Sequence, residues 1–469
     1  MSLLLKNSTN TMCLADNNRK FNEFRQEFSY FIYERYEYSF LSDSLDLKYY
    51  FNMAGKFIFT PMIHIPRTDL FDFKNVPKAA IENIVFHIGL IELISYWKAT
   101  CPPTVIIKPY KLEEAQVKWW KKLYFLGLGE FFYLNGIDTD SDTFLNIISE
   151  SDSMLSKADL SLEESVIVPV GGGKDSVVTL ELLKEKYAVT PLVINPRQAT
   201  SQCIQTAGIL TKDSIEIFRT IDPLLLELND QGYLNGHTPF SALLAFLSLL
   251  ASVLSNKRNI ALSNEASANE ATVLGQKVNH QYSKSYEFER DFRDYVGTFI
   301  SEDINYYSFL RPLHEIQIAY IFSKYPQYFD VFKSCNAGSK TDIWCCTCPK
   351  CLFAFIILSP FIKLEKLTEI FGENLLDKPS LLSYFKKLTG EDKVKPFECI
   401  GTISEINMAL SISIKKYEGE LPFLLKAYSE KQASNNLNEI YCIDWKNSFN
   451  NENFLTEENI NIIKHALSC

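Results

Sequence analysis

The chain has 469 residues, of which 46% are apolar and 22% charged, and its formal net charge is -10. Because single hydrophobic cores stop growing near ~250–300 residues, this length predicts two or three domains. Proteins that bind nucleic acid normally carry a basic stripe, so the acidic balance speaks against a nucleic-acid partner and favours a small-molecule substrate.

The first 155 residues are expected to form an α+β domain of their own. The chain turns polar within its first eight residues, too early for a signal peptide. Aromatic side chains recur over residues 30–40, and helices are predicted near Ala79–Lys98 and Glu113–Leu126. The polar, glycine-free stretch Asp138–Ser156 is predicted to link this domain to the next.

Residues 156–362 are predicted to alternate between short apolar strands and helices. The four expected strands are Val166–Val170, Pro191–Asn195, Ser214–Arg219 and Asn259–Leu262. Thr238-Pro239 is expected to begin a long apolar helix, with Thr238 as the N-cap and Pro239 as the first helical residue. This alternation predicts an α/β fold with a parallel sheet and helices on both faces, in which ligands bind at the carboxyl ends of the strands.

A glycine-rich loop follows the first of these strands. It reads Gly171-Gly172-Gly173-Lys174-Asp175-Ser176 and leads into a helix. Glycines let successive backbone N–H groups turn toward one anion, and the helix N-terminus adds partial positive charge. Lys174 would contribute a full charge, Ser176 a hydroxyl donor, and Asp175 a cap or a Mg²⁺ contact. The alternative is a tight turn that binds no ligand.

The spacing of this loop matches neither the GxxxxGK[ST] nor the GxGxxG pattern. It resembles the SGGxDS signature of the PP-loop ATP pyrophosphatases, with Gly171 in place of the signature serine. This resemblance implies an adenine nucleotide alpha hydrolase-like fold that splits ATP into AMP and diphosphate. We expect ATP at the loop, with Arg197 after the second strand as a further contact.

Other polar side chains also lie close to the predicted strand ends. His237 precedes the Thr238-Pro239 helix and is a candidate base; Glu265 follows the fourth strand and is a candidate base or Mg²⁺ ligand. A histidine that satisfies a turn and a solvated helix start are the alternatives. Substrate contacts are expected from amide, phenol and cationic side chains, although the cations could equally be plain surface charges. These residues are Asn235, Asn264, Asn269, Tyr282, Lys284 and Arg311.

Four cysteines, Cys335, Cys345, Cys348 and Cys351, follow the spacing C-x9-C-x2-C-x2-C, with Cys346 as an extra neighbour. Four thiolates can surround Zn²⁺ as a tetrahedron with bonds of ~2.3 Å, so the spacing predicts a structural zinc site. Clustered thiols without a secretion signal also indicate a reducing compartment, for which we expect the cytoplasm. A redox or sulfur-relay group and unliganded core cysteines are the alternatives.

Residues 363–469 are rich in Lys, Glu and Leu and predict a helical C-terminal region. Within it, Cys399 precedes Thr402-x-x-Glu405, a capping-box signature. A thiol near a helix N-terminus can have a lowered pKa, which makes Cys399 a candidate proton-transfer base or else a buried structural cysteine. The most apolar runs of the chain, 241–255 and 351–362, are shorter than the ~20 residues that cross a bilayer, so no membrane association is expected.

Ten short stretches spread over the chain together resemble the MurL family of PP-loop enzymes, ATP-dependent epimerases that act on UDP-N-acetylmuramoyl-L-alanyl-L-glutamate. They are Ile91–Lys98, Gly127–Asn135, Val168–Ser176, Leu234–Phe240, Ser263–Asn269, Tyr282–Phe288, Phe309–Leu313, Ser334–Asn336, Trp344–Cys351 and Lys395–Gly401. The glycine loop alone resembles any PP-loop enzyme, whereas the ordered set is far more specific.

The resemblance implies an enzyme that inverts the terminal L-glutamate of this UDP-linked muramoyl dipeptide to D-glutamate in peptidoglycan precursor synthesis. It also implies ATP and Mg²⁺, an acyl-adenylate, and release of AMP and diphosphate. Two alternatives remain. One is a PP-loop enzyme that modifies a nucleobase or a tRNA, because the cysteines also resemble the zinc site of the queuosine-precursor synthases. The other is a non-catalytic protein that uses the loop only to bind a nucleotide. The oligomeric state is not indicated by the sequence.

Overall fold

The computed structural model describes residues 16–73, 76–434 and 445–468. The protein is α/β, as predicted, and divides into two compact units, each assembled from segments that are distant in the chain. The first unit contains the chain up to Glu164 together with Ile215–Arg258 and Lys277–Asn305. The second unit contains Ser165–Ser214, Asn259–Gln276 and the chain from Tyr306 onward. The domain boundaries expected near residues 155 and 362 stay predictions.

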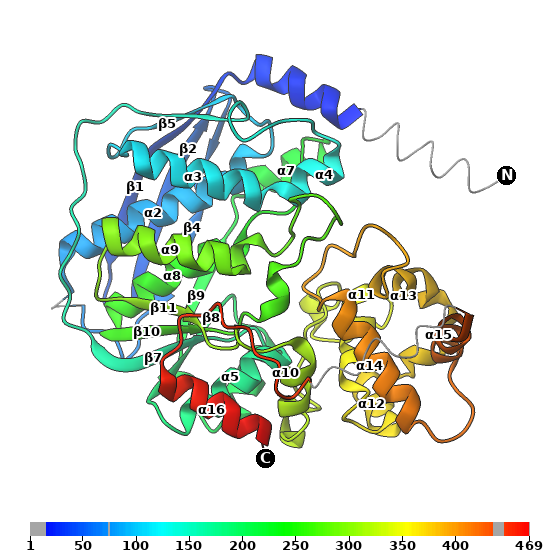
Figure 1. Cartoon of the computed structure of the whole chain (residues 1–469). Helices are drawn as coiled ribbons and strands as arrows, with labels where there is room; N and C mark the ends of the chain where they lie inside the picture. Colours follow the sequence, from blue (N-terminus) through cyan, green and yellow to red (C-terminus); the bar gives the residue numbers. More distant parts are fainter. Residues whose placement is uncertain (1–15, 74–75, 435–444, 469) are drawn as a thin grey trace. The chain divides into compact units, whose positions relative to one another are not determined.

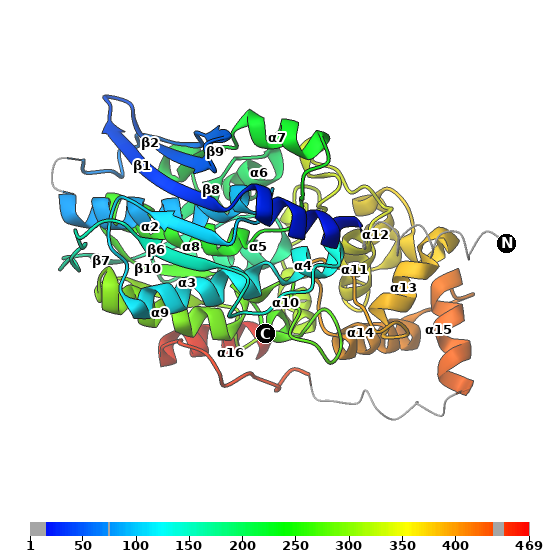
Figure 2. The same ribbon diagram turned by 90° about the horizontal axis from the view of Figure 1, so that it is seen from above.

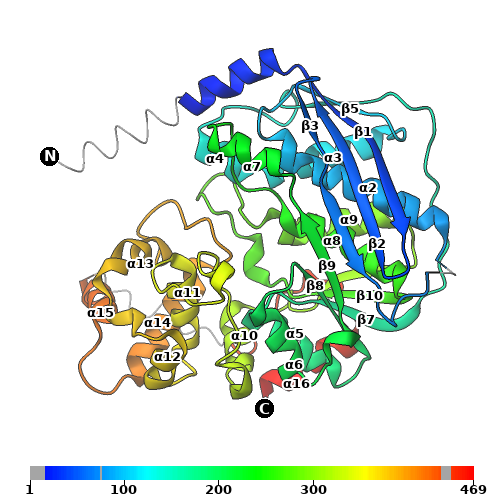
Figure 3. The same cartoon turned by 180° about the vertical axis from the view of Figure 1, so that it is seen from behind.

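The first unit contains a mixed sheet. Its strands are β1 (Tyr30–Phe40), β2 (Ser44–Met53), β3 (Phe57–Phe59), β4 (Met62–Pro66), β5 (Thr104–Ile107), β6 (Asn146–Ser149) and β9 (Ile215–Thr220). They lie in the order β9-β4-β2-β1-β5-β6, with β3 paired to β2, and Figure 3 shows β2, β1 and β5 side by side. The pairs from β9 to β1 are antiparallel, and β5 and β6 continue in parallel from β1. Burial alternates along β2, as expected for a strand with one face in the core.

Helices cover this sheet. They are α2 (Lys78–Trp97), α3 (Glu114–Gly127), α4 (Gly129–Asn135), α7 (Pro223–Asp230), α8 (Phe240–Leu254) and α9 (Tyr286–Phe299). Figure 2 shows α2 next to β1 and β2, with α3 and α9 beyond it. Gly89 permits this close packing, because a Cβ atom there would lie 2.0 Å from the hydroxyl oxygen of Tyr33. The helices predicted near Ala79–Lys98 and Glu113–Leu126 are confirmed by α2 and α3.

Helix α2 is also the one helix in the described part of the chain that is long and apolar enough to cross a membrane. The most apolar 18-residue segment of this helix is 89% buried inside the protein, which is typical of a core helix. One fully buried polar side chain on it, His87, has both ring nitrogens satisfied internally. His87 is hydrogen-bonded through one ring nitrogen to the Asn83 carbonyl oxygen (2.7 Å) and through the other to the Tyr295 hydroxyl (2.8 Å).

The second unit contains three of the four strands predicted for residues 156–362, while the remaining one, β9, and the predicted helix α8 belong to the first unit. Strands β7 (Glu163–Pro169), β8 (Val189–Ile194), β10 (Lys257–Leu262) and β11 (Asn305–Ser308) lie in the order β11-β10-β7-β8, and β7 and β8 are parallel. The helices that follow β7 and β8 are α5 (Lys174–Lys184) and α6 (Gln198–Thr206). Five consecutive residues at the end of β7 are buried, as expected for a central strand covered on both faces.

The rest of the second unit is helical. Its helices are α10 (Glu315–Phe322), α11 (Pro349–Leu358), α12 (Leu364–Phe371), α13 (Leu382–Leu388), α14 (Ile403–Lys416), α15 (Phe423–Ser434) and α16 (Glu457–Ser468). Figure 1 shows α11 to α15, coloured yellow to orange, gathered together. The expectation of a helical region beyond residue 363 is confirmed for the residues that the structure describes there.

Three local expectations are wrong. Helix α8 begins at Phe240 with Pro239 as its N-cap, because the ψ angle of Pro239 is 72° and not helical, so Thr238 is not the cap. The stretch 138–156, expected to be a linker, contains strand β6. Strand β9, expected within a parallel sheet, pairs antiparallel with β4.

Candidate functional site

The glycine-rich loop lies between β7 and α5, as predicted, and its three glycines differ in what they require. Gly172 has a φ angle of 81°, and a Cβ atom there would lie 3.1 Å from the backbone nitrogen of Thr200. Only glycine accommodates both the positive φ and this close approach. Gly171 is exposed, and nothing lies within 4 Å of the position of a Cβ atom. Gly173 is the N-cap of α5, so the backbone N–H groups of the first turn of this helix, which have no partner within it, lie at the loop.

Lys174, the basic residue of the loop, is buried. Its ammonium contacts the carboxylates of Asp175 and Glu315 and lies 5.9 Å from the ring centroid of Phe353. Burial lowers the pKa of Lys174, but the attraction of Asp175 and Glu315 outweighs it and raises the pKa above its usual value. The ammonium is therefore charged at neutral pH, and its position is fixed by two carboxylates.

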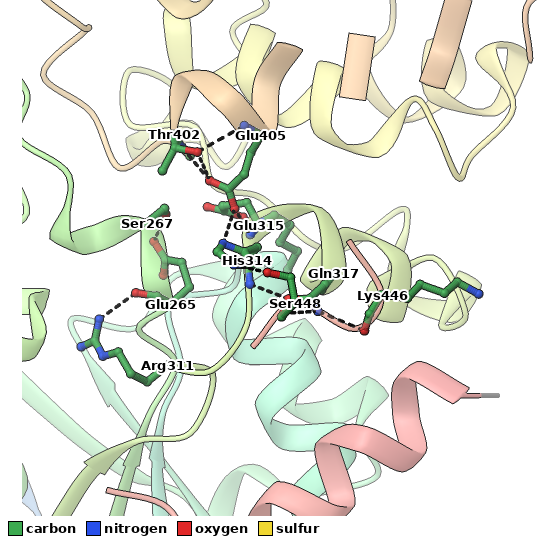
Figure 4. Close-up of polar contacts among 12 residues, drawn as sticks. Glu265, Ser267, Arg311, His314, Glu315, Gln317, Thr402, Glu405, Lys446 and Ser448 are labelled. Atoms are coloured by element: carbon green, nitrogen blue, oxygen red, sulfur yellow. Dashed lines mark hydrogen bonds and ion pairs between the residues drawn. The ribbon is translucent and has the colours of Figure 1, made fainter. Parts of the chain in front are cut away.

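Glu315 is a site residue that the sequence did not reveal. It is the first residue of α10, only 2% exposed, and its backbone N–H donates to the carboxylate of Glu405. Glu405 also closes the predicted capping box of α14, accepting from the Thr402 N–H at 2.7 Å. Figure 4 shows these residues in contact. The capping box, confirmed as predicted, thus also holds the start of α10, which presents Glu315 to Lys174.

Arg197 lies beside the loop, where the sequence placed it. Its guanidinium donates to the Gly171 carbonyl oxygen at 3.0 Å, and a second nitrogen lies 3.9 Å from the Asp342 carboxylate. Ser176, the third residue of α5, donates its hydroxyl to the Gly173 carbonyl oxygen at 3.0 Å. The side chains of Arg197 and Ser176 therefore both donate to backbone carbonyl oxygens of the loop.

Glu265 and Arg311 lie together in the second unit (Figure 4). Arg311 is fully buried and donates to the Glu265 carbonyl oxygen at 2.7 Å and to the Ser308 hydroxyl at 3.2 Å. Asn264 also donates to that hydroxyl, at 3.1 Å. The Glu265 carboxylate accepts from Ser267 at 3.0 Å and raises the pKa of nearby Glu315, after the larger contributions of burial and Asp175. Arg311 is thus no surface charge: it fixes the backbone that carries Glu265.

The remaining candidates of the second unit are less well supported. Asn269 ends a short 3-10 helix, Ala266–Asn269. Cys399 is half-buried, and its backbone carbonyl oxygen accepts from the Lys350 ammonium. It lies three residues before Thr402, the N-cap of α14. Because the influence of a helix terminus falls off within about one turn, α14 acts only weakly on this thiol.

His237 and three other candidates belong to the first unit. The ring Nδ1 of His237 lies 3.7 Å from the Glu130 carboxylate, and burial, then His280, lowers the pKa of His237 to about 4. The imidazole is therefore neutral at neutral pH, as a general base must be. Asn235 is engaged by Lys98, whose ammonium donates to the Asn235 side-chain oxygen at 2.9 Å and to the Gly236 carbonyl oxygen at 2.6 Å. Tyr282 is buried, and Lys284 is half-buried, in the 3-10 helix Tyr282–Lys284.

Sequence reasoning missed three residues around His237. Burial, then Arg219, lowers the pKa of Lys98 to about 8, and Glu130 and His280 both lie next to His237. Lys98 and Glu130 are parts of the stretches Ile91–Lys98 and Gly127–Asn135, so the family resemblance already contained the signal. In the stretch Leu234–Phe240, Asn235 and Gly236 accept hydrogen bonds from Lys98, and His237 lies beside Glu130.

The four predicted cysteines lie within 4.8 Å of one another through their sulfur atoms. The Sγ atoms of Cys335 and Cys348 are 3.8 Å apart, as are those of Cys345 and Cys351, and those of Cys348 and Cys351 are 3.5 Å apart. A tetrahedron with Zn–S bonds of ~2.3 Å has sulfur atoms roughly 3.8 Å apart, so these distances fit a zinc ion. Cys346 is excluded, because its thiol donates to the Phe371 carbonyl oxygen at 3.0 Å.

Comparison with known proteins places these residues in a family. The model of the MurL N-terminal domain matches residues 22–309, and that of the MurL C-terminal domain matches residues 331–439. A protein of Xanthomonas oryzae pv. oryzae (strain MAFF 311018), named UDP-N-acetyl-alpha-D-muramoyl-L-alanyl-L-glutamate epimerase, is 33% identical over 74% of this chain and 78% of its own length. A Salinispora tropica protein of the same name is 33% identical over 71% of this chain and 74% of its own. No solved structure matches the chain. The two domain matches and the identity over three quarters of the length, as the sequence resemblance implied, show that the chain belongs to the MurL family.

Proposed function

We propose that the protein uses ATP to invert the terminal L-glutamate of UDP-MurNAc-L-Ala-L-Glu to D-glutamate, releasing AMP and diphosphate. The observation that carries the epimerase activity is the match to relatives that bear this name over about three quarters of both chains. Membership in the MurL family also favours this reaction over the modification of a nucleobase or a tRNA. The substrate is accordingly a small molecule of peptidoglycan precursor synthesis, and we place the reaction in the cytoplasm.

The proposed ATP site is the loop Gly171–Ser176. The positive φ of Gly172 and the N-terminus of α5 support it, because both turn backbone N–H groups toward one anion. Lys174 and Arg197 supply positive charge at the two ends of the loop. Asp175 is the proposed Mg²⁺ ligand, and Glu265 is a candidate for either this ion or proton transfer, since carboxylates are the ligands that Mg²⁺ takes. The ion would neutralise phosphate charge while AMP is transferred.

The proposed chemistry begins with activation of the substrate. An oxygen of the glutamate α-carboxylate attacks the α-phosphorus of ATP, diphosphate leaves, and a mixed anhydride with AMP forms. Removing the α-hydrogen beside an ionised carboxylate would build a dianion, whereas beside an anhydride it builds a single enolate charge. Each unit by which the pKa of the α-carbon acid falls lowers the free energy of its deprotonation by about 1.4 kcal/mol. Return of a proton to the opposite face and attack of water on the anhydride give the D-glutamate product and AMP.

The proposed proton-transfer residues are His237, Glu265 and Cys399, in that order. His237 is favoured because its lowered pKa leaves it neutral and able to accept a proton at neutral pH. For the anionic substrate we propose Lys284 as a cationic contact, and Asn235, Asn264, Asn269 and Tyr282 as polar contacts. Arg311 is buried and holds the Glu265 backbone, so we assign it a positioning role instead.

The four cysteines are proposed to hold one structural Zn²⁺. The sulfur spacing supports this over a redox pair, because all four sulfur atoms lie within 4.8 Å of one another. Such an ion would fix the loop that joins the Cys335 region to α11, of which Cys348 is the N-cap.

The test is a stereochemical assay. Purified protein is incubated with ATP, Mg²⁺ and UDP-MurNAc-L-Ala-L-Glu, the product is hydrolysed, and the glutamate enantiomers are separated. D-Glutamate should appear together with AMP, and Lys174→Ala should abolish both. Lys184→Ala is the matched control, because Lys184 ends the same helix, pairs with Glu181 at 2.7 Å and should leave turnover unchanged. Only L-glutamate from the wild type would refute the proposed reaction, and D-glutamate without AMP would refute the role of ATP.

A further inference from the structure

Three ligating side chains from distant parts of the chain converge in the first unit. Glu130 lies on α4, His237 precedes α8, and His280 precedes the short helix Tyr282–Lys284. One potential ligand atom from each of the three lies within 4.8 Å of the other two. The same Glu130 oxygen contacts Nδ1 of His280 in a hydrogen bond and lies 3.7 Å from Nδ1 of His237. The two imidazole rings are 4.5 Å apart between centroids.

We propose that Glu130, His237 and His280 form a second metal site, separate from the cysteine cluster, that binds a divalent transition-metal ion. Two imidazoles and a carboxylate are the ligand set that zinc and its neighbours in the first transition row accept, whereas Mg²⁺ and Ca²⁺ prefer oxygen ligands. With metal–ligand bonds of ~2.0–2.2 Å, tetrahedral ligand atoms lie roughly 3.3 Å apart. The distance from the Glu130 oxygen to Nδ1 of His280 is shorter than that spacing, and the 3.7 Å distance to Nδ1 of His237 is longer.

The segments that carry these ligands are packed against one another. A Cβ atom at Gly236, next to His237, would lie 3.0 Å from the ring of Phe131, next to Glu130. A Cβ atom at Gly129 would lie 3.8 Å from the backbone of Val278, two residues before His280. Asn135, at the end of α4, donates to the Asn235 carbonyl oxygen at 3.2 Å. Both histidine segments therefore rest on α4 on either side of Glu130, an arrangement that holds three ligands in place before a metal binds.

The site is partly open, unlike the four-cysteine group. The side chains of Glu130 and His280 are 11% and 12% exposed, and that of His237 is 25% exposed. Three protein ligands with one accessible side leave a coordination position for water or for an anionic group, as in catalytic zinc sites. Lys98, held by Asn235 and Gly236, and Lys284 add positive charge around it, which favours an anion at that position. The inference does not rest on the proposed epimerase reaction.

Cobalt(II) distinguishes this site from the cysteines. The full-length protein, stripped of metal, is titrated with Co²⁺ and followed by absorption and by metal analysis after dialysis. Thiolate ligands give intense near-ultraviolet charge-transfer bands, whereas histidine and carboxylate ligands give only weak visible bands. We expect a second equivalent of Co²⁺ that adds visible absorption without further thiolate bands.

Glu130→Gln and His280→Gln should each lose that second equivalent and keep the thiolate bands. His64→Gln is the matched control, because His64 also contacts a carboxylate, that of Asp46 at 2.7 Å, but belongs to no group of three potential ligands among the residues that the structure describes. Circular dichroism checks that each variant is folded. The proposal is overturned if the wild type shows only thiolate bands, if both variants retain the second equivalent, or if His64→Gln also loses it. Glu130, His237 and His280 would then be a hydrogen-bonded group without a metal.

Discussion

At the scale of single residues, the loop shows which parts of a signature are required by geometry. The three glycines were all predicted to serve a phosphate, but only Gly172 combines a positive φ with a close approach to the neighbouring backbone. Gly171 replaces the serine of the PP-loop signature in open space. The loop could be recognised from the sequence because its residues, Gly171–Ser176, are consecutive. The sequence could not show Glu315, which reaches Lys174 only through the packing of α10 on α5.

The same substitution at two adjacent glycines should therefore have different effects. Gly171→Ser should change the free energy of unfolding by less than about 0.5 kcal/mol, because the side chain meets no atom of the protein. Gly172→Ser should destabilise by about 1–2 kcal/mol from the left-handed backbone alone, with a further cost for contact with Ala199 and Thr200. Chemical denaturation followed by circular dichroism measures both. Equal losses would contradict the distinction between the two positions.

At the scale of elements, the cysteine cluster is the part of the protein that spacing predicted best. A metal knuckle is local, so four of its determinants lie within 17 residues of sequence, from Cys335 to Cys351. The spacing also singled out Cys346 as the extra thiol among the five, and the described geometry agrees. The structure excludes Cys346, because this residue has a φ angle of 56° and directs its thiol to the Phe371 carbonyl oxygen.

Serine substitution of two neighbouring thiols tests the proposed zinc. Cys348→Ser should lower the zinc content by one equivalent and the stability by on the order of 3 kcal/mol, because it removes a zinc ligand, whereas the serine hydroxyl can still cap α11. Cys346→Ser should keep the zinc, since its thiol lies outside the tetrahedron. Elemental analysis and thermal melting report the two effects. Identical zinc contents in the two variants would show that the cluster does not bind metal as proposed.

At the scale of the whole molecule, three strands of the second unit, β7, β8 and β10, were predicted within a few residues, whereas β11 was not predicted. Residues 215–258 and 277–305 belong with the N-terminal segment, while the residues between them belong to the second unit. Periodicity describes each element by itself and does not say which partner it finds. The pairing of β9 with β4 and the meeting of Glu130 with His280 are long-range contacts of this kind, without a local pattern.

The order of chemical steps is a property of the whole enzyme, and hydrogen exchange tests it. If adenylation precedes inversion, turnover in D₂O should place deuterium at the glutamate α-carbon only when ATP is present. Without the anhydride, an enzyme base would have to create a dianion. Mass spectrometry of the recovered glutamate measures the incorporation. Exchange without ATP would refute the adenylate route and remove the chemical reason for the glycine loop.

The same experiment identifies the base. Adenylation needs the loop and Mg²⁺ but no proton transfer from carbon, so replacing the true base should stop deuterium incorporation while AMP is still released. The variants to test for this result are His237→Gln, then Glu265→Gln and Cys399→Ser, and His237→Gln gives it only if His237 acts as the base and not as a metal ligand. Loss of both AMP release and exchange would instead place the residue in substrate or metal binding, which for His237 is the outcome that a metal site with Glu130 and His280 predicts. The ratio of AMP formed to deuterium incorporated in each variant thus separates proton transfer from binding, residue by residue.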